Sequence, residues 1–68
     1  MKNVMYYYNA VEGEEELHED EEVAKLVNGE VIERNGEYWR ITEVLTTTGL
    51  GTPKPLDIVR VFLAGPVP

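Results

Sequence analysis

The sequence predicts an α+β fold, in which a small curled antiparallel β-sheet of about four strands carries one short acidic helix. Three features of the chain predict this fold. Residues 27–41, VNGEVIERNGEYWRI, contain the dipeptide Asn-Gly twice, and Asn-Gly between strand-like segments is a strong hairpin signal. Residues 12–22, EGEEELHEDEE, are rich in helix-forming glutamates, and residues 57–64, DIVRVFLA, form the most apolar segment.

The 68 residues are expected to form a single small domain over 1–68. A chain this short builds a marginal core, and the absence of cysteine excludes a disulfide or a cysteine-based zinc site as reinforcement. Good local geometry and self-association are the usual remedies, and we expect a homo-oligomer. No signal peptide is expected at the N-terminus, and no segment reaches the length of a membrane span, which favours a cytoplasmic protein.

Residues 3–11, NVMYYYNAV, predict the first strand, because they are rich in valine and tyrosine and lack a breaker. The even-numbered residues from Val4 to Ala10 would share one face, and the odd-numbered residues from Met5 to Val11 the other. Both faces carry apolar bulk, so the pattern alone does not say which one points inward.

Residues 14–27, EEELHEDEEVAKLV, present a choice between a helix and a strand that enters a hairpin at Asn28-Gly29. We favour the helix, because glutamate is a better helix former than strand former, acids suit the first turns and Val-Asn-Gly is a usual helix stop. Leu17, Ala24 and Val27 would line its apolar stripe. Like charges at helical spacing oppose this helix, and an alternative in which residues 12–16 are disordered stays open.

The second Asn-Gly, Asn35-Gly36, predicts a type I′ hairpin turn between two strand-like segments. Such a turn would pair Arg34 with Glu37, Glu33 with Tyr38 and Ile32 with Trp39. The core face would then hold Ile32, Trp39 and Ile41, and the opposite face Val31, Tyr38 and Val44. The whole stretch, GEVIERNGEYWRITEV, is similar to the central hairpin of many small SH3-like and other five-stranded barrels, and this resemblance implies an SH3-like open barrel as the alternative form of the sheet.

The C-terminal third predicts a loop and then a strand. Residues 46–56, TTTGLGTPKPL, combine threonine, glycine and proline without periodicity, which is typical of a long exposed loop. Residues 57–64 predict a strand that is central or at an interface, with Val59, Val61 and Leu63 on one face and Ile58 and Phe62 on the other. The terminal GPVP is expected to end strand pairing, because proline cannot donate a ladder hydrogen bond.

The inventory of reactive side chains predicts no catalytic residue and no cofactor site. The chain has no cysteine, serine or glutamine and one histidine, so Ser-His-Asp and Cys-His arrangements are excluded. Glu14, His18 and Glu22 are spaced four apart and would share one helical face, which is the only metal-like pattern. In so acidic a run a solvated helix face with a titrating histidine is the simpler interpretation, and no metal site is predicted.

The net charge of −7 is concentrated in residues 12–22, which hold eight of the 13 acidic side chains and no lysine or arginine. Because phosphate binding needs a basic face, direct nucleic-acid binding is disfavoured, and the same acids disfavour an anionic membrane surface. We expect this segment to contact a protein partner of basic character. The candidate partner-binding residues are Glu14, Glu15, Glu16, Glu19, Asp20, Glu21 and Glu22.

These features favour a small non-enzymatic protein-interaction module that self-associates through surplus apolar strand surface. A first alternative is that the carboxylates imitate a phosphate backbone and inhibit a nucleic-acid-binding protein, which requires an ordered helix with regularly spaced, outward-facing acids. A second alternative is a small ligand-binding barrel or enzyme that uses Tyr38, Arg40 and Glu43 in a pocket. That alternative requires a concave site with a perturbed carboxylate pKa.

Overall fold

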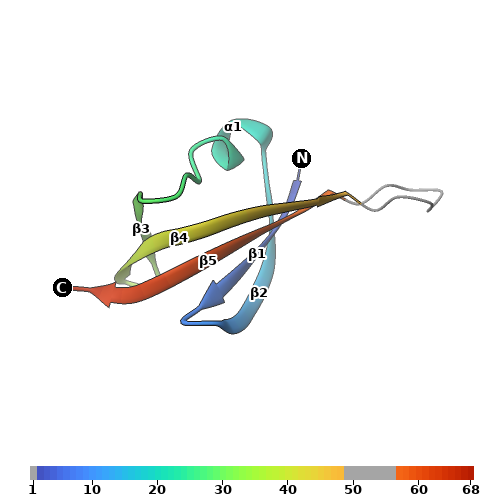
Figure 1. Ribbon diagram of the computed structural model, residues 1–68. Coiled ribbons are helices and arrows are strands. Elements are labelled where there is room, and N and C mark those ends of the chain that lie inside the picture. The colour runs from blue at the N-terminus through green and yellow to red at the C-terminus, as the bar shows by residue number, and fades with distance from the viewer. Residues whose placement is uncertain (1, 49–56) are drawn as a thin grey trace.

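The computed structural model describes residues 2–48 and 57–68, which form a five-stranded curled sheet with one short helix (Figure 1). The elements in chain order are β1 (Lys2–Tyr8), β2 (Val11–His18), α1 (Asp20–Val23), β3 (Val31–Arg34), β4 (Glu37–Thr48) and β5 (Asp57–Val67). The strand order is β2-β1-β5-β4-β3, with β1 and β5 parallel and the other neighbours antiparallel. The predicted small curled sheet with a short helix is confirmed, but it has five strands rather than four and is not wholly antiparallel.

The most apolar segment of the chain is the central strand β5, as predicted. It lies between β1 and β4, and its residues Val59, Val61 and Leu63 are at most 2% exposed. A strand with neighbours on both sides and a buried face hides the most apolar surface, which is why the richest run of valine, isoleucine, leucine and phenylalanine lies there.

The hairpin at Asn35-Gly36 is confirmed in register and turn type. Its strands β3 and β4 pair Arg34 with Glu37, Glu33 with Tyr38 and Ile32 with Trp39. Asn35 and Gly36 have φ values of 54° and 79°. Positive φ at both central residues defines a type I′ turn, whose twist matches that of the flanking strands.

A second hairpin replaces the single first strand that was predicted over residues 3–11. The chain reverses at Asn9-Ala10, so that Tyr8 at the end of β1 pairs with Val11 at the start of β2. Asn9 and Ala10 have φ values of 50° and 69°, again the type I′ conformation. The prediction was wrong here because alanine strongly disfavours positive φ and gives no turn signal in the sequence.

Replacing Ala10 by glycine is expected to raise the free energy of unfolding by about 0.5–1 kcal/mol, because glycine adopts positive φ without the steric cost that alanine bears. Ala10 is exposed, so the substitution removes no core contact. Gly36→Ala is the reciprocal variant, since it places alanine at the matching turn position, and we expect it to be destabilising. Urea unfolding of the three chains measures both effects; a less stable Ala10→Gly chain would contradict the strained turn.

The predicted helix over residues 14–27 is wrong for most of its length. Residues 14–18 belong to β2, which pairs with β1 through Val4 and Glu16, and α1 is a single turn over Asp20–Val23. Glu19 and Glu22 form a capping box at its start. Pairing with β1 outweighs the helical preference of glutamate, which is a weak bias. The alternative in which residues 12–16 are disordered is also wrong, since they lie within β2.

The first Asn-Gly is neither the helix cap that we favoured nor a hairpin turn. It forms a tight turn in which the Glu30 amide donates to the Val27 carbonyl at 3.0 Å, with Gly29 at φ 96°. This turn is joined to β4, because Gly29 N–H donates to Ile41 O at 2.7 Å and Ile41 N–H donates to Glu30 O at 2.8 Å. The turn at Asn28-Gly29 therefore connects the segment after α1 to the edge of the sheet, where β3 begins beside β4.

One face of the sheet carries the core. Its buried residues, all at most 2% exposed, are Val4, Tyr6, Ile41, Val59, Val61 and Leu63. Ile32, Trp39 and Val44 pack against this cluster, together with Val23 and Leu26 from α1 and the segment after it. The prediction for Val44 was wrong, since it was assigned to the opposite face. The register of β4 against β5 shifts between Ile41 and Glu43, and such a bulge reverses the alternation of faces beyond it.

The C-terminal residues continue the sheet, contrary to the expectation that GPVP ends pairing. β5 extends to Val67, which pairs with Tyr38. The Asn9 side chain supports this extension beyond the end of β1, because its Nδ2 donates to Gly65 O at 2.9 Å and its Oδ1 accepts from Gly65 N–H at 3.1 Å.

The exposed loop predicted over residues 46–56 is shorter than expected at its start, since β4 runs to Thr48. The rest of the segment for which a loop was predicted, residues 49–56, lies outside the described residues. None of the helices in the described part of the chain has the length and hydropathy of a membrane-spanning segment.

Candidate functional site

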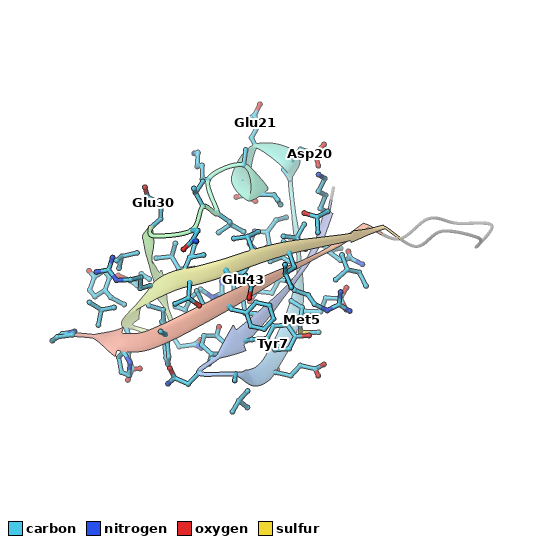
Figure 2. The ribbon with its side chains drawn as sticks, viewed as in Figure 1. Met5, Tyr7, Asp20, Glu21, Glu30 and Glu43 are labelled. Carbon is cyan, nitrogen blue, oxygen red and sulfur yellow. The ribbon has the colours of Figure 1, made fainter. Side chains whose placement is uncertain are left out.

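The outer face of the sheet, opposite the core, is a second apolar surface. We define the outer face by six side chains that register places on one side of neighbouring strands: Met5, Tyr7, Leu17, Leu45, Ile58 and Phe62. The structure brings them together from four strands, and Figure 2 shows Met5 and Tyr7 near the middle of the sheet with Glu43 beside them. Within the described ranges, the helix packs on the core face and no other helix or strand lies over the outer face.

An aromatic pair forms the centre of the outer face. The rings of Tyr7 and Phe62 stack with centroids 4.7 Å apart and planes inclined by 14°. Arg60 Nε donates to the Tyr7 hydroxyl at 3.3 Å, which fixes the ring against its neighbours. Around this pair the exposed rim is apolar as well, since Leu45 is 43% exposed and Leu17 is 66% exposed.

Charges of both signs lie within the same surface. Arg60 pairs across strands with Met5 on one side and with Leu45 on the other. Glu15 is opposite Met5 on β2, and Glu43 is opposite Phe62 on β4. The outer face therefore has a cation on the central strand β5 and carboxylates on β2 and β4.

A second feature, the Arg34 cluster, lies on the core side where the edge strands β2 and β3 approach each other. The Arg34 guanidinium on β3 forms an ion pair with Glu16 on β2, donates to the Tyr8 hydroxyl at 3.3 Å and lies 4.2 Å from the Tyr6 ring centroid. His18 Nε2 is 3.2 Å from both Glu16 Oε2 and the Tyr6 hydroxyl. These contacts link two strands that share no backbone pairing.

The electrostatics of the cluster follow from these contacts. Hydrogen bonding to Arg34 is the main cause that lowers the pKa of Glu16. The same bond raises the pKa of Arg34 against the opposing effect of burial. Burial raises the pKa of the Tyr6 phenol, because its charged form would be poorly solvated. At neutral pH the Arg34 cation of this cluster is bound by the Glu16 carboxylate and by the side chains of Tyr6 and Tyr8. The cluster thereby joins the two edge strands of the curled sheet.

The lowered pKa of Glu16 predicts a loss of stability in acid. A carboxyl group whose pKa is lower in the folded chain stabilises the fold above its unfolded pKa and loses that contribution as pH falls through the folded pKa. Unfolding should therefore become easier below about pH 4.5, the ordinary value for this group. Glu16→Gln should show a smaller decline between pH 7 and pH 3 than Glu21→Gln, a control at an exposed site. Equal declines in urea unfolding experiments would contradict the role of Glu16.

A groove of about 340 Å³ opens beside the Arg34 cluster. Its lining residues are Tyr8, Gly13, Glu14, Glu16, Arg34 and Asn35. Gly13 is required there, because a Cβ atom would lie 2.7 Å from Tyr8 Cε2 and 2.9 Å from Tyr6 O. The Tyr8 ring occupies the space that a side chain at position 13 would fill, and it packs against the β2 backbone there.

The candidate partner-binding acids do not form one surface. Glu15 lies on the outer side of β2, Glu14 lines the groove and Glu16 binds Arg34. Glu19 and Glu22 cap α1. Figure 2 shows Asp20 and Glu21 projecting from α1 away from the sheet. The helical row of carboxylates that a phosphate-backbone mimic requires is not formed, since β2 and a single helical turn divide the segment between them.

The metal-like pattern does not assemble. His18 Nδ1 lies 3.4 Å from Glu22 Oε2 and His18 Nε2 contacts Glu16, whereas Glu14 lines the groove. Over residues 2–48 and 57–68, no group of three or more such side chains is placed to hold a metal ion.

The residues suggested for a ligand-binding pocket are also separated. Arg40 donates to the Gly29 carbonyl at 3.2 Å, Glu43 lies on the outer side of β4, and Tyr38 is 54% exposed. None of the three lines the groove.

Sequence reasoning missed both the outer face and the Arg34 cluster as assembled surfaces. The outer face had a signal, namely apolar residues on both sides of the segments 3–11 and 57–64. Arg34 had none, because its partners Glu16 and Tyr8 are 18 and 26 residues away in the chain. Comparison with known proteins finds no matching family model, no matching curated protein and no matching solved structure.

Proposed function

We propose that this protein is a small non-enzymatic protein-interaction module that self-associates through the outer face of its sheet. The observation that supports the proposal is the outer face, over which no other helix or strand lies within residues 2–48 and 57–68, with Tyr7 and Phe62 stacked at its centre. A sheet that is apolar on both faces needs a covering layer on each of them. Contiguous apolar surface on a small chain marks an interaction site.

The charges of the outer face favour a second copy as the covering layer. A two-fold interface buries the same patch of both copies, so the patch must complement itself. Arg60 on β5, Glu15 on β2 and Glu43 on β4 provide both signs within one patch. A two-fold axis that passes between Arg60 and the carboxylates on one side of it would bring Arg60 of one copy towards the carboxylates of the other.

The size of the chain supports the same conclusion. Only six side chains are fully buried in the described part of the chain, which is a small core for a domain without disulfides. A standard interface hides about 800 Å² on each copy, roughly one sixth of the 4802 Å² of accessible surface. One face of a five-stranded sheet is of that order, so dimerisation would add apolar burial that a single copy lacks.

Light scattering on matched variants tests this function. The unmodified chain should have twice its chain mass of 7.7 kDa at micromolar concentration, and Leu45→Lys on the rim of the outer face should shift it towards the monomer. Val27→Lys is the control, because Val27 is 51% exposed in the segment after α1 and outside the sheet. Circular dichroism establishes that each variant is folded. A monomeric unmodified chain, or equal masses for the two lysine variants, would contradict the proposal.

Within this module, the acidic residues of β2 and α1 are proposed to attract a protein partner of basic character. Glu14, Glu15 and Glu21 are exposed, and together with the neighbouring acids they make β2 and α1 strongly negative. Such a surface raises the association rate of a basic partner and makes it sensitive to salt.

A further inference from the structure

The open side of the half-barrel lies between its two edge strands. β2 and β3 are at opposite ends of the strand order, yet the curl of the sheet brings them close enough for Arg34 to reach Glu16. In the described residues each of these strands has a neighbour on one side only. An edge strand presents unpaired N–H and C=O groups that can pair with another chain.

The groove beside the Arg34 cluster lies along this open side. Gly13 and Glu14 of β2 line it on one side, and Arg34 and Asn35 line it on the other. Gly13 has backbone atoms only, so backbone of β2 forms part of the groove's lining, while the Tyr8 ring covers the side on which a Cβ atom would lie.

From this geometry we infer that the free edge of β2 accepts an extended segment of a basic protein, which adds a strand beside residues 11–16 and places a lysine or arginine near Glu14. Main-chain hydrogen bonds to the β2 edge would hold the segment, and the groove would select its side chains. This surface is separate from the outer face, so the inference does not depend on self-association.

The charges of β2 determine the chemistry of this partner. Glu16 forms an ion pair with Arg34, whereas Glu14 forms no ion pair among the residues described here. The strand VEGEEELH carries four glutamates and no lysine or arginine, so the β2 strand of a second copy would be repelled. A segment with lysine or arginine at alternate positions complements the same edge.

Peptide titration followed by NMR of the ¹⁵N-labelled chain tests the inference. The probe is an eight-residue peptide of alternating lysine and threonine. Two control peptides are the same peptide with N-methyl groups at alternate amides, and a peptide in which glutamate replaces lysine. We expect the first peptide to shift the amide signals of residues 11–16 and Arg34, and both controls to bind at least about tenfold more weakly, since they lack backbone donors or the cation.

A pair of protein variants isolates the groove from the general negative charge. Glu14→Lys should weaken binding of the lysine peptide by about tenfold, whereas Glu21→Lys, which makes the same charge change on α1, should weaken it by less than about threefold. Preserved amide dispersion shows that both variants are folded. Equal weakening by the two variants, undiminished binding of the N-methylated peptide, or shifts confined to α1 would overturn the inference. Each of those results would indicate nonspecific electrostatic attraction without strand addition.

Discussion

Replacing Ile41 by alanine is expected to lower the free energy of unfolding by about 2–5 kcal/mol, because it removes a fully buried side chain and leaves a cavity. Ile41 is 0% exposed and pairs with Leu63 of the central strand. Its backbone also anchors the chain segment that follows α1, through hydrogen bonds with Gly29 and Glu30. With six fully buried residues in the described core, loss of one of them affects a large share of the apolar contacts.

Leu45→Ala is the matched control for this prediction, since Leu45 lies on the same strand and is 43% exposed. Under conditions in which the chain is monomeric, this variant should lose less than about 1 kcal/mol. Urea unfolding followed by Trp39 fluorescence and by circular dichroism measures both variants. Equal losses at the two positions would mean that Ile41 is not at the centre of the core.

Replacing Gly13 by alanine is expected to cost about 1–3 kcal/mol, the range for inserting a carbon atom into a well-packed site. The added Cβ would lie 2.7 Å from Tyr8 Cε2 and 2.9 Å from the Tyr6 carbonyl oxygen, closer than van der Waals contact allows. Either the Tyr8 ring moves away from Arg34 or β2 moves away from β1. Both movements also weaken the link between the edge strands.

The neighbouring variant Glu14→Ala controls for the position, because Glu14 is exposed and its backbone is in the same strand. It should change the free energy of unfolding by at most about 0.5 kcal/mol. Urea unfolding again provides the measurement. A Gly13→Ala chain as stable as the unmodified one would contradict the packing of Tyr8 over this glycine.

The elements that could be predicted from the sequence are those determined by local chemistry. Asn35-Gly36 defines a type I′ turn, and the pairing of Ile32 with Trp39 follows from the turn alone. The central position of β5 follows from its continuous apolar run. In both places propensity, pattern and tertiary context agree, which is the condition for reliable inference from a single sequence.

The elements that could not be predicted are those in which tertiary contacts overrule local preference. Residues 14–18 prefer helix, but Glu16 faces inward on β2 because Arg34 from a distant strand neutralises it. The turn at Asn9-Ala10 holds alanine at φ 69°, a conformation for which the sequence offers no signal. The wrong prediction of a helix over residues 14–18 follows from the unpredicted turn at Asn9-Ala10, because that turn reverses the chain and allows β2 to pair with β1.

The candidate site, like the fold, could be predicted from the sequence only in part. Composition alone identified the acidic residues, and their location on β2 and α1 depends on the elements that the sequence did not predict. The outer face depends on the parallel pairing of β1 with β5, which joins Tyr7 to Phe62 across 55 positions of the chain. Pairing between such distant segments is set by the competition of all strands for partners, and no local pattern records it.

The most direct test of the central claim is an isotope-filtered NOE experiment on a mixture of ¹³C-labelled and unlabelled chains, which reports only contacts between copies. If the outer face is the interface, the methyl groups of Met5 and Leu45 in one copy will show NOEs to ring protons of Tyr7 and Phe62 in the other. The absence of such NOEs in a sample of twofold mass, or NOEs from Val11 and Val27 in their place, would contradict the assignment of the outer face as the interaction surface.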